Sequence, residues 1–317
     1  MEQSKFSTKC AGIDVSKAQL DAGLARAEDR TSVANREDAF EALGTWLKTR
    51  GIVRVGIEAT GGYERAVVEW LRAAGFEVIV FQPKEVRLFA RFRRIRAKTD
   101  KIDARVIALA AAYVDGVKAA NDPRLAELAE RLTAYEQAAD MLALAKTHRE
   151  HITLADLKAS KAEEIKLLTD RKKALKKDLL KRLKLQADLM QRYRLLRSIP
   201  GIGELISAAL VIRMPELGQM EHGQAPSLIG VAPFNRDSGK HVGKRFIQGG
   251  RSRPRRHLYM AALTAKRTKG MFHTLEQRLL AAGKEKKVAI VAVMRKLIEA
   301  ANLVLKRQTP WTKTVPA

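Results

Sequence analysis

Four acidic residues in the first third of the chain are spaced for metal-ion chemistry. Asp14 and Glu58 each follow a short apolar run ending in Gly-Ile, a pattern typical of the end of a buried strand. Asp100 and Asp103 open an alanine-rich run that predicts a helix, and a spacing of three places both on one helix face. Neighbouring carboxylates repel one another unless a cation lies between them. Taken singly, each acid also fits a helix cap; together they indicate a metal site.

The oxygen ligands of these acids favour Mg²⁺, with Mn²⁺ as the alternative, over zinc. Such ions can stabilise both the attacking and the leaving oxygen in phosphodiester chemistry. The segment from Lys84 to Arg105 holds nine Lys or Arg against three acids, so it can hold a nucleic-acid strand through its phosphates. The cations predicted to bind nucleic acid in this segment are Arg91, Arg93, Arg94, Arg96 and Lys98.

The whole chain is strongly basic. Its 317 residues hold 60 Lys+Arg against 35 Asp+Glu, which gives a net charge of +25. A polyanionic partner explains such an excess better than any property of a compact monomer. No run of eighteen apolar residues and no signal-peptide core are found, and Cys10 is the single cysteine. We therefore expect a cytoplasmic protein without disulfides that binds nucleic acid and no membrane.

Three sections are expected along the chain. Residues 1–120 alternate short apolar runs with helical stretches, the pattern of an α/β layer fold. Residues 121–196 form a helical spacer, a hairpin or coiled coil, because no Gly or Pro occurs from Arg124 to Ile199. The basic stretch Arg171 to Lys184 is either a solvated helix face or a rail for a nucleic-acid backbone. Residues 197–317 are expected to be mostly α-helical.

The turn Pro200-Gly201-Ile202-Gly203 resembles the hairpin of helix-hairpin-helix DNA-binding proteins. Glycines at such a turn let backbone N–H groups approach a phosphate, and the following helix presents its positive end. Gly201 and Gly203 are therefore predicted to bind nucleic acid. A simple helix-breaking loop is the alternative.

Taken together, these strings resemble a known family. The order Gly-Ile-Asp14, Ile-Glu58-Ala-Thr-Gly and Lys-Thr-Asp100-Lys-Ile-Asp103 is similar to that of the four-acid (DEDD) insertion-sequence transposases. Ser198-Ile-Pro-Gly-Ile-Gly203 and Leu258-Tyr-Met-Ala-Ala-Leu263 are similar to the C-terminal domain of that family. The resemblance implies a RuvC-like domain with a ribonuclease-H fold, a serine nucleophile used with the metal site, and a non-coding bridge RNA that guides recombination.

The resemblance places the nucleophile in Pro233-Phe-Asn-Arg-Asp-Ser238-Gly, which identifies Ser238. An Asp-Ser-Gly turn exposes a hydroxyl, and nearby cations would bind phosphate and favour the developing alkoxide. An ordinary turn serine is the alternative interpretation. Ser252 is the competing nucleophile, but it looks like a helix N-cap before Pro254. The cations around the two serines that are predicted to bind nucleic acid are Arg236, Lys240, Lys244, Arg245, Arg251 and Arg253.

The sequence as a whole therefore predicts a DNA transposase or recombinase. Its expected partners are double-stranded donor and target DNA, a guide RNA and further copies of the chain in a homodimer or tetramer. Two alternatives remain at this point. A structure-specific nuclease, such as a junction resolvase, would use metal-bound water and form no covalent link. A basic coiled-coil protein that only organises nucleic acid would gain nothing from acids inside a basic groove.

The charge excess predicts a steep salt dependence of nucleic-acid binding. Each neutralised phosphate releases counterions, so the logarithm of affinity should fall with the logarithm of salt by about 0.9 per contact on duplex DNA. Affinity measured at several salt concentrations tests this expectation. A flat response would mean that the charge of +25 has another purpose.

Overall fold

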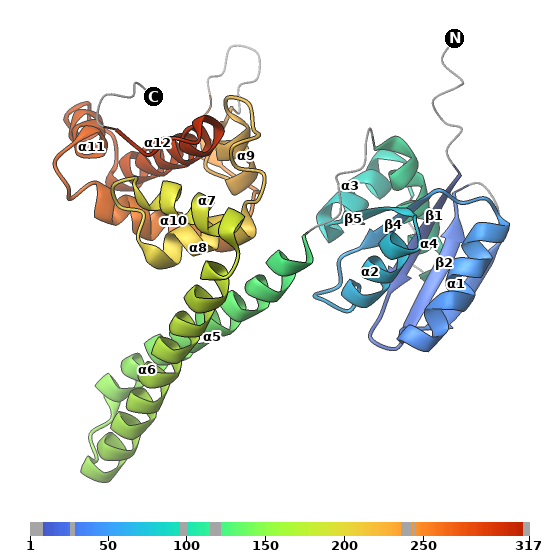
Figure 1. Cartoon of the computed structure of the whole chain (residues 1–317), viewed down its shortest axis with the longest axis horizontal. Coiled ribbons are helices and arrows are strands. Elements are labelled where there is room, and N and C mark those ends of the chain that lie inside the picture. Colours follow the sequence, from blue (N-terminus) through green and yellow to red (C-terminus); the bar gives the residue numbers. More distant parts are fainter. Residues whose placement is uncertain are drawn as a thin grey trace. The chain divides into compact units, whose positions relative to one another are not determined.

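The computed structural model describes residues 9–25, 29–95, 100–114, 122–235, 243 and 245–312, without the side chains of residues 100–103. The chain divides into two compact units, residues 1–120 and 121–317, each described here by itself. Figure 1 labels their helices and strands.

A five-stranded mixed sheet forms the centre of the first unit. Its strands follow the order β3-β2-β1-β4-β5. The central strand β1 pairs in parallel with β4 and antiparallel with β2; β4–β5 is parallel and β2–β3 antiparallel. The strand bounds are β1 Cys10–Val15, β2 Gln19–Leu24, β3 Arg30–Ala34, β4 Arg54–Glu58 and β5 Glu77–Phe81.

Helices cover both faces of this sheet. Alternate strand residues, such as Ile13 and Ile57, point to one face and bury themselves against α1 (Glu37–Thr49) and α2 (Arg65–Ala73). The opposite face is covered by α3 (Pro83–Phe92) and α4 (Asp100–Tyr113), whose apolar residues pack on Phe81. The first unit is therefore a three-layer α/β/α arrangement.

Three glycines let α4 come unusually close to the sheet. Gly12, Gly23 and Gly56 are register neighbours on β1, β2 and β4, and we call them the glycine row. A Cβ added at Gly12 would lie 2.1 Å from the Ala104 carbonyl oxygen, and one at Gly56 would lie 2.9 Å from that of Ile107. No side chain fits between the strands and the backbone of α4 at Gly12 and Gly56.

Arg54 fixes the other end of α4. Its guanidinium donates to the carbonyls of Ala111 at 3.2 Å and Val114 at 3.0 Å, and it pairs with Glu77 at 3.0 Å. A cation at this position satisfies the last carbonyls of the helix and complements its dipole. The glycine row and Arg54 therefore together fix the position of α4 on the sheet.

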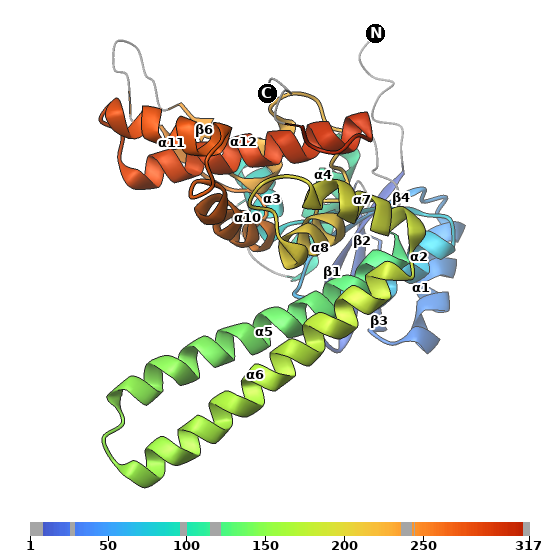
Figure 2. The same cartoon turned by 60° about the vertical axis from the view of Figure 1, so that its left-hand side comes forward.

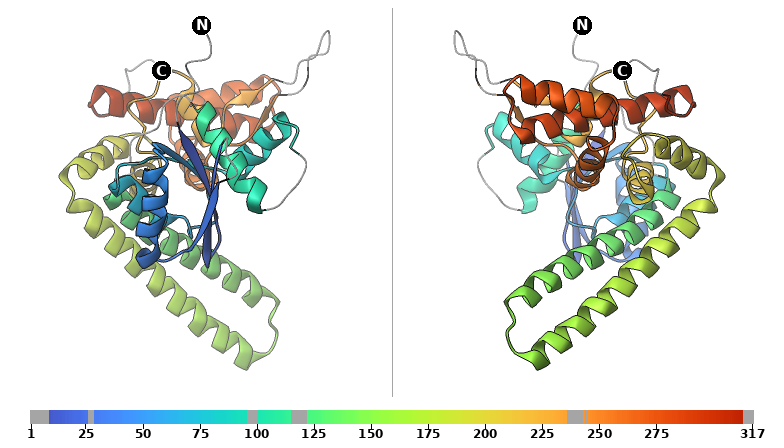
Figure 3. Two further views of the ribbon diagram at one scale, coloured as in Figure 1. Left: turned by 90° about the vertical axis from the view of Figure 1, so that its right-hand side faces the viewer. Right: turned by 90° about the vertical axis from the view of Figure 1, so that its left-hand side faces the viewer.

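The second unit begins with two long helices, α5 (Pro123–His151) and α6 (Ala155–Lys184), which run side by side as a hairpin in Figures 2 and 3. The remaining elements are α7 Ala187–Arg197, α8 Glu204–Arg213, α9 Gln224–Ile229, β6 Pro233–Phe234, β7 Phe246–Ile247, α10 Ser252–Ala265, α11 Met271–Ala281 and α12 Lys286–Arg307. None of the described helices is long and apolar enough to cross a membrane.

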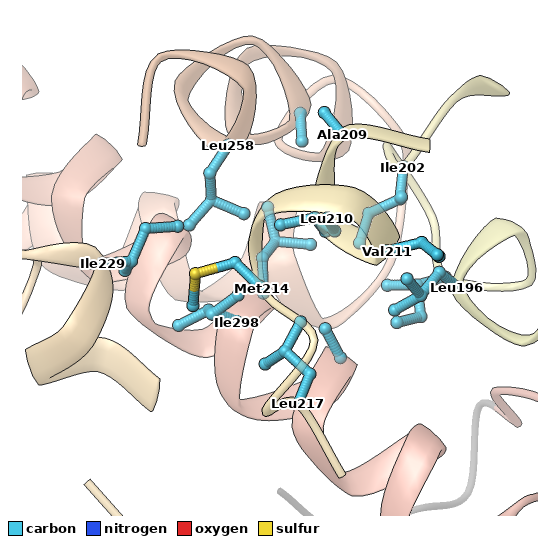
Figure 4. Close-up of a cluster of buried hydrophobic side chains, with 14 of the residues drawn as sticks. Leu196, Ile202, Ala209, Leu210, Val211, Met214, Leu217, Ile229, Leu258 and Ile298 are labelled. Carbon is cyan, nitrogen blue, oxygen red and sulfur yellow. The ribbon is translucent and has the colours of Figure 1, made fainter. Parts of the chain in front are cut away.

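One hydrophobic core holds the base of the hairpin and the C-terminal helices together. Figure 4 shows part of it, where Leu210 and Met214 of the α8 region pack near Leu258 of α10 and Ile298 of α12. Leu128 and Leu132 of α5 and Leu179 and Leu183 of α6 belong to the same cluster. The hairpin is thus anchored by leucines at its base.

Charged pairs reinforce the same end of the hairpin. Arg131 of α5 contacts Asp178 of α6 at 2.7 Å, and Arg182 of α6 contacts Glu127 of α5 at 3.0 Å. Each arginine also pairs with the acid four residues before it on its own helix. A closed network costs less side-chain entropy per pair than isolated surface pairs, so it helps fix the register of the two helices.

The structure shows the alternating strands and helices expected for residues 1–120 and the helical hairpin expected after them, but it also contains two elements that were not expected. No strand was expected over Arg30–Ala34, which is β3. The basic segment after Lys84 was expected only as a binding surface, whereas α3 spans Pro83–Phe92. β3 is a partly exposed edge strand without a continuous apolar run. The burial of α3 rests on the single fully buried residue Val86.

The glycine row yields a stability prediction. Gly12→Ala should lower the free energy of unfolding by about 3 kcal/mol, because its Cβ would overlap backbone that cannot move aside. Gly23→Ala is the matched control, since its Cβ would make only ordinary van der Waals contacts with α4, the nearest to the Ala104 Cβ at 3.4 Å. Thermal or urea unfolding of the two variants decides the point. Equal stability would show that α4 can move away from the sheet.

Candidate metal and nucleic-acid sites

Asp14 and Glu58 lie side by side in the sheet. The β1–β4 ladder ends at the pair of Ile13 with Ile57, and each acid is the next residue along these adjacent parallel strands. Both follow a glycine of the row by two residues, so the pleat directs both to the α4 face. Each is half-buried. The sheet therefore brings these two predicted ligands together, about one strand spacing, roughly 4.8 Å, apart.

Asp100 and Asp103 lie in the first turn of α4. Their side chains lie outside the description, but their backbone position is constrained by Ala104, the next residue, whose carbonyl oxygen is the closest atom to a Cβ placed on Gly12. Gly12 in turn precedes Asp14 by two residues. The chain thus carries the second pair of predicted acids to the neighbourhood of the first.

A further acid, Asp21, shares this position, and the sequence analysis missed it. Asp21 is the register partner of Asp14 across the β1–β2 ladder, and opposite residues of a ladder point to the same face. Its carboxylate accepts a hydrogen bond from the Gln19 side-chain amide at 3.1 Å. The alternation Gln19, Asp21, Gly23 would have revealed it, had the glycine been used to identify the face.

The donor atoms of these acidic residues suit a divalent cation. The described side chains contain no cluster of three or more His, Cys, Asp or Glu that would hold a metal ion on their own. Asp14 and Glu58 offer hard oxygen donors from two rigid strands, and the first turn of α4 adds two acidic positions beside them. Oxygen ligands of this kind suit Mg²⁺ or Mn²⁺.

Glu64 organises the loop that follows Glu58. Its carboxylate accepts hydrogen bonds from the backbone N–H of Thr60 at 3.1 Å and of Gly62 at 2.8 Å. Burial alone would raise the pKa of Glu64, but these backbone bonds and the Thr60 hydroxyl outweigh it and hold that pKa below its ordinary value. Gly61 and Gly62 adopt positive φ, so the tight turn requires glycine there. The loop is therefore held in one conformation.

Asn35 joins the loops that follow the two acids. Its side-chain amide donates to the Ser16 carbonyl at 2.9 Å and to the Tyr63 carbonyl at 3.0 Å. Ser16 lies two residues after Asp14, and Tyr63 lies five after Glu58. Both partners are acceptors, which also fixes the orientation of the amide. Asn35 itself is held by a backbone bond to Ala18 at 2.9 Å.

The predicted cations of the Lys84–Arg105 segment divide into two groups. Arg91, Arg93 and Arg94 lie at the end of α3 and are exposed; Arg93 also donates to the Tyr113 hydroxyl at 3.4 Å. Arg96 and Lys98 lie outside the described residues.

The predicted nucleophile Ser238 also lies outside the described residues, as do Arg236, Lys240 and Lys244. The structure does describe the base of their loop. β6 and β7 pair antiparallel, Pro233 with Ile247 and Phe234 with Phe246. This short ladder brings the two ends of the loop together. Arg245 precedes β7 and is exposed.

The two predicted glycines of the Pro200 turn differ in how closely they are packed. Gly201 has a φ of +87°, and a Cβ there would lie 2.6 Å from the Ala261 carbonyl oxygen, so this glycine is required where the turn packs on α10. Gly203 is the N-cap of α8, and a Cβ there would meet no atom within 4 Å, so packing does not require a glycine at this position.

Arg251 and Arg253 are engaged within the protein. Arg251 contacts Glu216 at 2.6 Å, and Arg253 contacts Glu136 at 3.4 Å. Both arginines thus already have a carboxylate partner, which makes them weaker phosphate-binding residues than exposed cations without one. Ser252 is the first helical residue of α10, and Arg251 is the N-cap, so the expectation that Ser252 caps this helix is corrected by one position.

Glu136 is the centre of a polar cluster that ties α5 to α8 and α10. It contacts Arg213 at 2.9 Å and the His257 ring at 2.8 Å, and only 15% of its side chain is exposed. Burial raises the pKa of Glu136, but the His257 hydrogen bond and the charge of Arg213 outweigh it and lower that pKa overall. This cluster is a structural link between helices, and sequence reasoning gave no sign of it.

Two protein-family models match segments of this chain. Residues 11–147 match the family model of the DEDD transposases of the IS110 type, and residues 193–277 match that of the transposase IS116/IS110/IS902 family. A pilin gene-inverting protein of Moraxella bovis is 25% identical over 96% of this chain and 98% of its own length. The pilin gene-inverting protein of Moraxella lacunata is similar to the same extent. The chain belongs to the IS110-type transposase family.

The two matched segments fall on the sites just described. The first match begins in β1 and contains all four acids of the transposase, from Asp14 to Asp103. The second contains the Pro200 turn and the loop between β6 and β7. This transposase is a DNA recombinase by family, and the four-acid type implies dependence on a divalent metal ion.

Asn35 offers a test of how the acids are positioned. Asn35→Ala should reduce DNA cleavage by about 10- to 100-fold, because small displacements of reacting groups are costly. It should also raise the Mn²⁺ concentration needed for half-maximal cleavage and weaken Mn²⁺ binding measured directly by electron paramagnetic resonance. DNA affinity should stay unchanged.

Asp38→Asn is the control for this test, because it removes only one partner of an exposed ion pair with Arg36 and leaves both loops intact. Normal Mn²⁺ binding and normal cleavage in Asn35→Ala would contradict the positioning role.

Proposed function

We propose that this transposase cuts and rejoins DNA strands with a Mg²⁺ site on Asp14, Glu58, Asp100 and Asp103 together with Ser238 as the nucleophile; Mn²⁺ is the alternative ion. The observation that carries the proposal is the placement of Asp14 and Glu58 on neighbouring parallel strands, under a helix whose first turn holds the other two acids. The mixed sheet with acids at the carboxyl ends of β1 and β4 supports the RuvC-like assignment of residues 1–120.

The chemical step is a transesterification. The Ser238 hydroxyl loses its proton to a base and forms an O–P bond; the bond from phosphorus to the leaving DNA oxygen breaks, and that oxygen takes up a proton. A DNA hydroxyl then attacks the phosphoserine, releases Ser238 and restores a phosphodiester. When bound, the divalent ion stabilises negative charge on the phosphate oxygens. Each step exchanges one ester for another, so no nucleotide hydrolysis is needed.

Rejoining distinguishes this proposal from a nuclease of the resolvase type. The Moraxella relatives are named for inverting a gene, and inversion requires that cut ends be joined again. The ladder between β6 and β7, which closes the loop that carries Ser238, also supports a defined role for that loop. The resolvase alternative remains as one outcome of the experiment below.

Each section of the chain has a proposed role. We assign catalysis by the acids to residues 1–120, a helical coiled-coil spacer to 121–196 and a transposase domain with Ser238 to 197–317. The proposed partners are donor and target DNA and a non-coding guide RNA, bound by a homodimer or tetramer. The net charge of +25 supports binding to more than one nucleic-acid strand.

Covalent trapping tests the proposal. Stalled reactions of the wild-type protein should contain DNA attached to protein, which appears on denaturing gels as a slow band that protease removes. Ser238→Ala should remove the band and lower recombination by about 10³-fold or more. Ser252→Ala should retain the band.

Asp14→Asn and excess chelator should likewise abolish cleavage while leaving DNA binding largely intact. Normal recombination by Ser238→Ala would exclude that residue as the nucleophile. Clean hydrolysis without an adduct would favour the resolvase-type reaction.

A further inference from the structure

Helix α3 presents a face that combines cations with apolar side chains. Lys84, Arg87 and Arg91 are exposed and recur at intervals of three and four, so they lie along one side of the helix. Leu88 is 52% exposed and Phe92 is 76% exposed, and their spacing from Lys84 places them on the same side. The opposite side, with Val86, packs against α4. We call the exposed set the α3 face: Lys84, Arg87, Leu88, Arg91 and Phe92.

The cations of the α3 face have no acidic partner in the part of the chain that the structure describes. Among the described residues, no carboxylate lies within ion-pair distance of Lys84, Arg87 or Arg91. The only acid of α3, Glu85, accepts a hydrogen bond from the Gln82 backbone at 2.7 Å and so caps its own helix. In the second unit, by contrast, arginines such as Arg131 and Arg182 are paired with acids. The α3 face is therefore complementary to a polyanion.

A pocket of about 540 Å³ lies on this face. It is lined by Gln82, Pro83, Lys84, Arg87, Leu88 and Arg91. A concave surface lined by both cationic and apolar side chains can receive a base as well as phosphates.

Phe92 is held in place although it is exposed. The end of α3 is closed by hydrogen bonds from Arg94 to the Arg91 carbonyl at 3.0 Å and from Ile95 to the Ala90 carbonyl at 2.9 Å. Arg94 adopts a φ of +57°, a left-handed conformation that arginine seldom takes. The backbone that carries Phe92 is thus fixed, and its ring remains in water.

The α3 face begins at the same edge of the sheet as the proposed metal site. Glu58 is the register partner of Phe81, and the Ala59 N–H donates to the Phe81 carbonyl at 2.9 Å. Gln82, the first residue of the pocket, follows Phe81 directly. A DNA strand with a phosphate near Glu58 would therefore lie close to the pocket on the α3 face.

We infer that the α3 face binds an unpaired stretch of DNA next to the scissile phosphate, with phosphates on Lys84, Arg87 and Arg91 and a base stacked on Phe92. A duplex keeps the faces of its bases covered, so an exposed aromatic ring gains little from it. An unpaired base offers a free π-face to such a ring. The inference rests on the proposed function, because it takes the neighbouring acids to be the cleavage site.

Binding measurements with the full chain test the role of Phe92. The probes are a fluorescent oligodeoxynucleotide of about 15 residues, within the span of single-strand sites, its duplex with the complementary strand, and an RNA of the same sequence. Phe92→Ala should weaken binding to single-stranded DNA by about 5- to 100-fold and leave duplex binding unchanged. Phe92→Tyr retains an aromatic ring and should restore the affinity. Leu154→Ala removes another exposed apolar side chain, 61% exposed and placed between α5 and α6, and should have no effect.

The cations give a second, independent readout. Arg91→Ala should reduce the slope of log affinity against log salt by about 0.7 on single-stranded DNA, the value for one lost phosphate contact. Lys48→Ala, an exposed lysine in the last turn of α1, is the matched control and should keep the slope.

Three results would overturn the inference. Unchanged single-strand binding by Phe92→Ala would remove the stacking contact. An equal loss on duplex and single strand would indicate an ordinary backbone surface or a folding defect. A loss confined to the RNA probe would show that DNA is the wrong occupant. Failure of the serine chemistry is seen separately, as absence of the covalent adduct in the wild-type protein, and would leave these binding results unchanged.

Discussion

The close approach of α4 to the sheet is the contact on which the proposed metal site depends. At Gly12 and Gly56 the backbone of the helix lies where any side chain would have to be. The acids of β1 and β4 are two residues further along the same strands, and the first turn of α4 is adjacent to its contact with Gly12. Backbone packing therefore sets the separation between the two acid pairs. Such packing fixes the backbone positions from which the acids extend, and a preorganised site requires this.

The use of charge differs between the two units. In the second unit many arginines are structural, since they connect α5 to α6, α8 and α10 through carboxylates. In the first unit the cations of α3 have no such partners among the described residues. The net charge of a protein thus says little about which cations bind nucleic acid. A cation paired with an acid inside the protein binds phosphate weakly, whereas a cation without such a partner attracts phosphate with its full charge.

Sequence reasoning found the elements with strong local signals and missed what depends on contacts across the fold. Asp14 and Glu58 were identifiable because each follows a buried apolar run. β3 was missed because an edge strand needs no such run, and its pairing with β2 decides its conformation. Asp21 and Asn35 were missed because their importance lies in register and in two backbone carbonyls far apart in sequence. No local pattern encodes such relations.

The helical hairpin has an uneven distribution of buried side chains, with a consequence for how the family can diversify. The buried residues that join it to the large hydrophobic core lie near the base, and beyond Ala145 no residue before Leu179 is buried. Whole turns can therefore be added to or removed from both helices at the far end without creating a cavity. The length of the hairpin can then change during evolution while the rest of the unit stays constant. The reach of the hairpin can therefore vary independently of the residues that carry the chemistry.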